Sequence, residues 1–246
     1  MTDQSYQFPK FYVTSPFPCP YLPNKQERKV FTDLSGPDAS ELNESLGKVG
    51  FRRSQSVAYR PACEGCSACV SVRVVSLDFI HNKSQRKIWR QNKDLEVEVI
   101  NAFATEEQFT LLKKYITIRH SEGGMAEMDE FEYSEMIDSS PVHTTIVEYR
   151  EPQLEKNNSR PGKLIGTALT DVLSDGLSMI YSFFDPECDR KSLGTYIILD
   201  HIARAKAQYL PHIYLGYWVK GSPKMDYKEK FQPLERLGQG GWEQDK

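Results

Sequence analysis

The C-terminal half of this 246-residue chain orders its apolar segments in a way that few folds accommodate. Three successive segments have the β-branched and aromatic composition of strands: Thr144–Tyr149, Leu164–Val172 and Leu177–Phe184. The sequence Ser174-Asp-Gly176 predicts a tight turn between the last two. A helical pattern then runs from about Ser192 to Tyr209, and one more strand follows at Ile213–Val219. Three strands in a meander, a helix and a further strand predict an α+β fold.

The N-terminal half is less regular. Five prolines within residues 1–25 preclude a regular helix or a central strand, so we expect an extended arm that packs on the body. We then expect a helix, two strands and a second helix, at Asp38–Leu46, Phe51–Arg60, Val70–Leu77 and Ser84–Asn92. A third helix starts at Thr105, because Thr105-Glu-Glu-Gln108 fits a capping box. Residues 157–162 are expected to form a loop.

Composition limits the class of protein. The chain is 39% hydrophobic and 26% charged, which supplies enough apolar material for a sizeable core. It has no run of about 18 apolar residues, and its first residues lack the basic start and apolar run of a secretory signal. We therefore expect a cytoplasmic protein that does not engage a membrane. From the length we expect one or two domains.

Basic residues are concentrated in one part of the sequence. Ten lie between Lys48 and Lys93, opposed by two acids, whereas residues 122–138 hold seven acids and no Lys or Arg. Four of the basic residues recur at helical spacing and share one side of a helix: Lys83, Arg86, Lys87 and Arg90. Such a stripe suits the phosphate backbone of a nucleic acid. A solvated helix face is the alternative.

Four cysteines have the spacing of a metal site. Cys63, Cys66 and Cys69 form a C-x-x-C-x-x-C run, and Cys19 lies upstream between two prolines. A two-residue gap lets thiolates converge on tetrahedral zinc or on three corners of an iron–sulfur cluster, with Cys19 as the remote ligand. A set of reduced thiols without a metal is the alternative, and the sequence does not choose between them.

The segment between the third strand and the long helix suits an acyl-transfer site. The order of elements is similar to the core of GNAT acyltransferases, in which this helix N-terminus binds the pyrophosphate of acetyl-CoA. Ser192 or Thr195 could cap the helix, and Gly194 would let a ligand approach the backbone. Ser192 and Gly194 are therefore, with the basic stripe, our candidates for binding the nucleic acid. The usual Gln/Arg-x-x-Gly-x-Gly/Ala loop is missing, which argues against acetyl-CoA. An ordinary helix cap is the alternative.

Three further residues are candidates for the chemistry itself. Asp185 ends the third strand, where it would position or deprotonate an incoming amine. Lys224 and Tyr227 follow the last strand and would bring a cation and a phenol to the same place. The alternative for this last segment is a solvated C-terminal stretch.

Taken together, several motifs resemble a known family. They are Cys19-Pro, Gly50-Phe-Arg-Arg-Ser54, Tyr59-Arg-Pro-Ala-Cys63, Ser84-Gln-Arg-Lys87, Phe184-Asp-Pro186, Ser192-Leu-Gly194, Tyr214-Leu-Gly-Tyr217 and Lys224-Met-Asp-Tyr-Lys228. In this order they resemble the arginyl/leucyl-tRNA–protein transferases, and the short chain with its C-x-x-C-x-x-C run is most similar to the bacterial leucyl type. The resemblance covers nearly the whole chain. It implies two regions: residues 1–100, which bear the cysteine cluster, packed on a GNAT-like region of residues 101–246.

The resemblance implies an activity and its partners. Leucine would pass from leucyl-tRNA to the N-terminus of proteins that begin with Asp or Glu, marking them for degradation by the N-end rule, with no cofactor required. Arg53 and Arg60 are our candidates for binding the acidic side chain, because a guanidinium holds a carboxylate in bidentate fashion. Tyr181, Phe183 and Tyr217 are candidates for an apolar leucine pocket.

Other functions stay open at the level of sequence. An arginyltransferase of the same family would use a different aminoacyl-tRNA. A GNAT N-acetyltransferase would use acetyl-CoA on the same fold. A metal-dependent nucleic-acid binding module or a redox sensor would explain the basic stripe and the cysteines, but not the C-terminal half.

Overall fold

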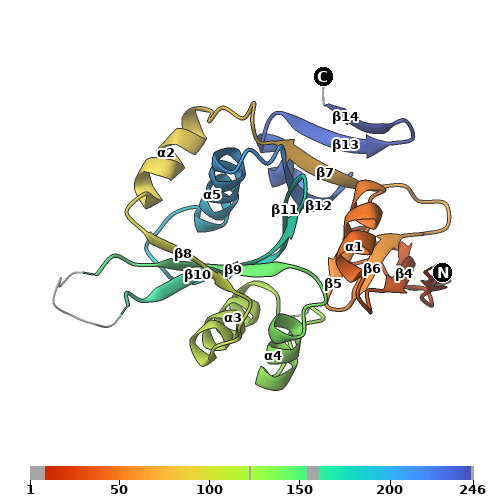
Figure 1. Cartoon of the computed structure of the whole chain (residues 1–246), viewed down its shortest axis with the longest axis horizontal. Helices are drawn as coiled ribbons and strands as arrows, with labels where there is room; N and C mark the ends of the chain where they lie inside the picture. The colour runs from red at the N-terminus through yellow and green to blue at the C-terminus, as the bar shows by residue number, and fades with distance from the viewer. Residues whose placement is uncertain (1–8, 122, 154–160, 245–246) are drawn as a thin grey trace, which may run out of the picture.

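An eight-stranded mixed sheet forms the centre of the molecule (Figure 1). The computed structural model describes residues 9–121, 123–153 and 161–244. In spatial order the strands are β14 (Gly241–Gln244), β13 (Leu234–Gly238), β7 (Cys69–Val75), β12 (His212–Val219), β11 (Gly176–Phe184), β10 (Leu164–Leu173), β9 (Thr144–Arg150) and β8 (Glu96–Asn101). Neighbours are antiparallel except β11 and β12, which run parallel.

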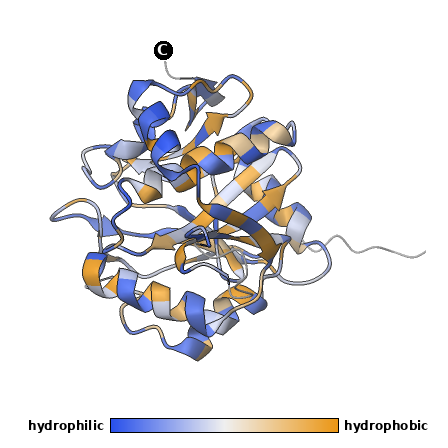
Figure 2. Cartoon of the chain, turned by 90° about the vertical axis from the view of Figure 1, so that its left-hand side faces the viewer, coloured by the Kyte–Doolittle hydropathy of each residue, from blue (hydrophilic) through white to orange (hydrophobic). Residues whose placement is uncertain are grey.

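Helices cover both faces of this sheet. Figure 1 shows α2 (Lys83–Asn92) and α5 (Leu193–Ala207) above it, and α3 (Glu106–Arg119) and α4 (Glu130–Asp138) below it. Each layer encloses its own core of buried side chains, one centred on Ile197 and Leu199 and the other on Leu112 and Tyr133. The helices intersperse hydrophobic and hydrophilic residues, as the amphipathic cover of a sheet requires (Figure 2).

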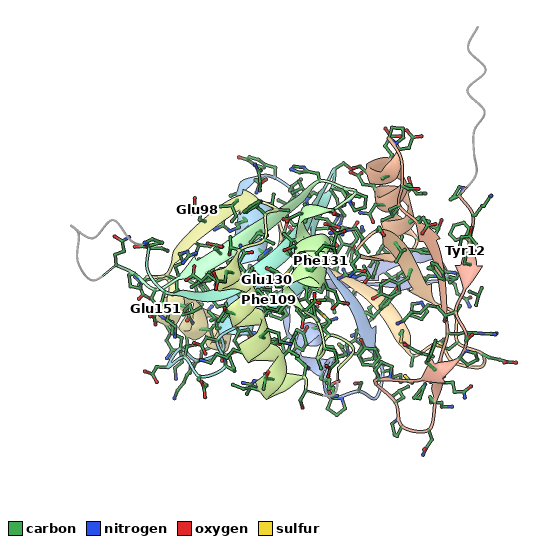
Figure 3. The ribbon with its side chains drawn as sticks, turned by 90° about the horizontal axis from the view of Figure 1, so that it is seen from below. Tyr12, Glu98, Phe109, Glu130, Phe131 and Glu151 are labelled. Atoms are coloured by element: carbon green, nitrogen blue, oxygen red, sulfur yellow. The ribbon has the colours of Figure 1, made fainter. Side chains whose placement is uncertain are left out.

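A smaller sheet packs at one end. It has the order β1 (Tyr12–Val13), β4 (Lys29–Asp33), β6 (Val57–Pro61) and β5 (Arg52–Ser54), and α1 (Ala39–Lys48) covers it over a small core. A two-stranded ribbon, β2 (Phe17–Pro18) with β3 (Gln26–Glu27), lies in the proline-rich arm. Seen from below, Phe109 and Phe131 lie over the face that α3 and α4 cover, and Tyr12 and Glu151 lie at opposite ends (Figure 3).

The structure confirms the predicted α+β fold and the order of elements in the C-terminal half. Thr105 caps α3 with the predicted capping box. The prediction of a single strand at Phe51–Arg60 was wrong, because the chain turns at Gln55, with φ of 52°, and forms the hairpin of β5 and β6. The sequence also left α4, β8 and the β13–β14 hairpin unpredicted, and most of the predicted 157–162 loop lies outside the described residues.

The first hundred residues contribute two strands to the central sheet. β7 lies between β12 and β13, and β8 forms an edge beside β9. The two predicted regions therefore share one sheet. No helix in the described ranges is long and apolar enough to span a lipid bilayer.

Candidate active site

Two central strands separate partway along their length. β11 and β12 pair through three residues each, Gly176–Ser178 with His212–Tyr214. Beyond them the pairing ends, and both strands are irregular at that point: β11 shifts register against β10 near Met179, and β12 shifts against β7 near Leu215. Such bulges increase the local twist of a strand. We use the term fork for the unpaired segments, residues 179–184 of β11 and 215–219 of β12.

Two cations bind carbonyl groups at the fork. Arg52 Nη2 donates to the Met179 carbonyl at 2.6 Å, and Lys228 Nζ donates to the Tyr217 carbonyl at 2.5 Å. Gly216 makes room for the guanidinium: it has φ of 77°, and a Cβ there would lie 2.8 Å from Arg52 Cζ. The two cations therefore approach the Gly216–Tyr217 segment from β5 and from the 3-10 helix η1 (Asp226–Lys230).

Lys228 is 5% exposed. Burial lowers its pKa from 10.5 to about 7, and the positive charge of Arg52 adds to the effect. A lysine with a pKa this low exchanges its proton near neutral pH, which an exposed lysine does not do. Sequence reasoning selected its neighbours, Lys224 and Tyr227, and missed Lys228 itself.

Aromatic and basic side chains surround the fork. Tyr115 of α3 packs on Phe184 of β11 with ring centroids 5.2 Å apart, and its hydroxyl is 3.2 Å from His120 Nε2. Burial and then the charges of Lys224 and Arg119 lower the pKa of His120. Burial and then the Tyr115 phenol raise the pKa of Tyr227. The structure thus brings the predicted Lys224 and Tyr227 to the end of α3, beside the fork.

The three aromatics predicted to hold leucine lie in different surroundings. Phe183 is 1% exposed and belongs to the core under α3 and α4. Tyr181 is half-buried, and burial raises its pKa to about 12. Tyr217 lies in the fork, where its hydroxyl donates to the carbonyls of Gly50 and Tyr59 at 2.7 and 3.1 Å. Tyr181 and Tyr217 therefore have partly accessible rings, whereas Phe183 has almost none.

Asp185 is held by two lysines. Its carboxylate is 2.6 Å from Lys114 Nζ and 2.8 Å from Lys163 Nζ. Burial acts to raise the pKa of Asp185, but the hydrogen bonds from both lysines outweigh it and hold the pKa at about 2. A carboxylate with so low a pKa is a weak proton acceptor. This geometry suits fixing the end of β11 better than deprotonating an amine.

The two arginines predicted to bind the substrate carboxylate differ sharply. Arg53 is 4% exposed and forms a two-point ion pair with Asp171, at 2.7 and 2.6 Å, so its guanidinium is occupied. Arg60 is exposed, donates to the Val49 carbonyl and lies 5.3 Å from the Phe51 ring centroid. It also acts on the pKa of Tyr217, which places it near the fork. Arg52, next to Arg53, is the arginine that enters the fork.

The N-terminus of α5 differs from its predicted form. Ser192 precedes the helix at φ of 60° and makes no side-chain capping bond, so the predicted Ser cap is wrong. The space beside Gly194 is filled by Phe184, whose ring would lie 2.9 Å from an added Cβ. Gly194 thus allows β11 to approach α5 closely.

The basic stripe of α2 is accessible. Lys83, Arg86, Lys87 and Arg90 are all exposed, while Gln85 and Asn92 on the other side of the helix are buried. Arg86 donates to the His81 carbonyl through one nitrogen of its guanidinium. The stripe lies on the outer side of the layer that contains α5.

The cysteines gather at the far end of β7, near the fork. Cys69 pairs with Val219 of β12, and burial followed by the neighbouring thiols of Cys63, Cys19 and Cys66 raises its pKa to about 11. All five cysteines are free. Within the described ranges no three His, Cys, Asp or Glu side chains are arranged to hold a metal ion. The donor atoms suit zinc or iron–sulfur, but their arrangement does not fit either.

The fold defines the class first: the mixed sheet and the order of its elements are those of a GNAT-like α+β fold. The structure of L-PGS from Bacillus licheniformis superposes with a TM-score of 0.50 at 11% identity, over 71% of this chain and 58% of that one, which shows a shared fold alone. The family models described as "Arginine-tRNA-protein transferase, N terminus" and "C terminus" match residues 17–87 and 107–238.

Relatives named "Aspartate/glutamate leucyltransferase" cover nearly the whole chain. Those of Rhizorhabdus wittichii and Sphingomonas elodea are 59% and 56% identical over 98% and 96% of this chain, and 90% of each relative is covered. The relative from a Bradyrhizobium strain is 54% identical over 98% of this chain and 94% of its own length. The chain therefore belongs to the arginyl/leucyl-tRNA–protein transferase family and is an aminoacyltransferase.

Proposed function

We propose that the protein transfers leucine from leucyl-tRNA to the α-amine of proteins that begin with Asp or Glu. The observation that carries this proposal is the match of 54–59% identity, over nearly the full chain, to relatives with that name. The leucylated proteins would then be degraded by the N-end rule. The setting would be the cytoplasm, where aminoacyl-tRNA and nascent substrates meet.

The reaction needs no activated cofactor. The acceptor's α-amine attacks the ester carbon of leucyl-tRNA and forms a tetrahedral intermediate. The C–O bond to the terminal ribose then breaks, the ribose hydroxyl takes up a proton, and the amine loses one as the amide forms. An α-amine has a pKa of about 7.7–8.0, so holding it against the ester supplies much of the catalysis.

The residues around the fork support specific roles in this reaction. Tyr181 and Tyr217 offer apolar ring surface for the leucine side chain, which a charged arginine side chain would occupy at high cost. Lys224 and Tyr227 lie at the edge of the fork and would contact the terminal adenosine or its leaving hydroxyl. Arg60 is exposed near the fork and would contact an acidic acceptor. The stripe on α2 would bind the tRNA backbone.

The proposed steps use no metal. The cysteine cluster lies beside the fork, at the end of β7 and β12, and as arranged it does not fit a metal. Metal analysis of protein purified without oxygen tests whether zinc or iron binds there, because a bound ion would appear at a fixed ratio to the chain.

Donor and acceptor specificity are tested together. The purified protein is supplied with leucyl-tRNA, arginyl-tRNA or acetyl-CoA, and with peptides that differ only in a first residue of Asp, Glu, Arg or Ala. We expect one leucine on the Asp and Glu peptides and no product from the other donors. Efficient use of arginyl-tRNA or of acetyl-CoA would replace the proposal with the corresponding transferase.

A further inference from the structure

The fork holds two basic side chains, Arg52 and Lys228, that no acid balances. Arg52 is half-buried and Lys228 is buried, and among the described residues neither has a carboxylate within 4.0 Å. Two other arginines are paired with an acid: buried Arg53 with Asp171 and half-buried Arg73 with Glu235. Arg52 and Lys228 therefore differ from the arginines whose charge an acid balances within the fold.

The hydrogen bonds to the Met179 and Tyr217 carbonyls do not explain why basic side chains occupy the fork. A neutral amide also donates to a carbonyl, and it does so without the cost of burying a cation. The groups that face Lys228 are Arg52 from β5, Tyr217 from β12 and Tyr227 from η1, and none is an acid. Tyr217 is in turn influenced by Arg60 of β6, a further cation. Such an arrangement is favourable once an anion enters.

We propose that Arg52 and Lys228 form an anion subsite that takes the side-chain carboxylate of the acceptor's first residue. This proposal rests on the proposed transfer to Asp and Glu and names the residues that select for it. Both residues lie inside motifs that the sequence contains, Gly50-Phe-Arg-Arg-Ser54 and Lys224-Met-Asp-Tyr-Lys228. Arg52 is next to Arg53, and Lys228 is next to Tyr227, the residues that the sequence suggested for the site.

The position of the subsite fits the reaction. The carboxylate of Asp or Glu lies only a few bonds from the α-amine, so the subsite fixes the amine beside the fork. Lys224, Tyr227 and Tyr115 surround that place. Because 5% of Lys228 is exposed, a small terminal carboxylate reaches it more readily than a phosphodiester with a ribose on either side.

The test compares acidic acceptors with their amide counterparts. Full-length protein transfers labelled leucine from leucyl-tRNA to peptide pairs that start with Asp or Asn, and with Glu or Gln. The variants are Lys228→Met, Arg52→Gln and Arg52→Lys, and exposed Lys206→Gln on α5 is the control. We expect Lys228→Met and Arg52→Gln to lower kcat/KM for acidic peptides roughly 10- to 100-fold, the range of a charge-assisted hydrogen bond. The amide peptides should change much less, and Arg52→Lys should keep most of the selectivity.

Each other outcome overturns the proposal in a distinct way. If acidic and amide peptides lose activity equally, the two residues act on the shared chemistry or on the fold. If the variants instead raise KM for leucyl-tRNA and weaken its salt dependence at an unchanged Asp-to-Asn ratio, the anion is an RNA phosphate. If the wild type leucylates no peptide, the proposed function fails and the subsite with it. Thermal unfolding of each variant shows whether it folds. If Arg52→Gln does not fold, Lys228→Met and Arg52→Lys decide whether the loss of activity is specific to acidic peptides.

Discussion

Replacing Lys228 with methionine should stabilise the protein near neutral pH, by an amount that depends on pH. Methionine keeps most of the aliphatic length of lysine and removes the ammonium group. The pKa of Lys228 falls from 10.5 to about 7 on folding, which corresponds to about 5 kcal/mol at about 1.4 kcal/mol per pH unit. Against this, the Tyr217 carbonyl loses its donor, at a cost of about 1–3 kcal/mol that does not vary with pH.

The sign follows from proton binding. Below pH 7 lysine is protonated in both the folded and the unfolded protein, so the full penalty is present. Between about pH 7 and 10.5 the unfolded chain keeps a proton that the folded protein has released, so the stability of the wild type rises with pH. The advantage of Lys228→Met should therefore shrink by about 2.3 kcal/mol between pH 7 and pH 9.

Urea unfolding at pH 6, 7, 8 and 9 measures this difference, and Lys206→Met serves as a control because Lys206 is exposed. The control should run parallel to the wild type. If Lys228→Met also runs parallel to the wild type over this range, Lys228 is not a buried cation without an acidic partner. The case for the anion subsite would then lose its physical basis.

Three further predictions concern other parts of the molecule. Gly216→Ala should cost at least about 1 kcal/mol in urea unfolding and should weaken transfer to acidic peptides, because the new Cβ would lie 2.8 Å from Arg52 at a positive φ. A stable, fully selective variant would contradict this. Asp185→Asn should cost about 2 kcal/mol at pH 7, a difference that should vanish between pH 4 and pH 2 as the wild-type carboxylate is protonated, while the pH–rate profile near neutrality keeps its shape. A lost rising limb would make Asp185 the base after all. Replacing the four basic residues of α2 by Gln should raise KM for leucyl-tRNA and flatten its log–log salt dependence by up to about 1 for each phosphate that the helix no longer binds. An unchanged slope would leave α2 as a solvated helix.

Long apolar segments made most of the C-terminal fold predictable. β10, β11 and β12 are buried along most of their length, so their composition alone indicates strands. β8 alternates Glu and Val at a sheet edge, and α4 (EFEYSEMID) has acids at four of its nine positions, so neither has a strong apolar signal. The β5–β6 hairpin depends on a left-handed Gln55, and such a residue is rare enough that the sequence favours one long strand.

The site was harder to predict than the fold. Arg52 and Arg53 are neighbours on a strand, so they face opposite sides, and only the tertiary structure decides which of them enters the fork. Lys228 lies in a polar segment that would suit a solvated loop. Its burial results from η1 packing on β12, an interaction that local sequence does not encode. The capping box of α3 was predictable because it needs only Thr105 and Gln108, which are close in sequence.

The placement of β7 affects when the protein can become active during its synthesis. β7 pairs with β12 and with β13, which the ribosome makes about 140 and 160 residues later. A growing chain therefore leaves β7 unpaired on both edges, and Lys228, made between those two strands, is absent until translation of this stretch is nearly complete. The chain can therefore close its central sheet and bring Lys228 to the fork only after β12 and β13 have both been made.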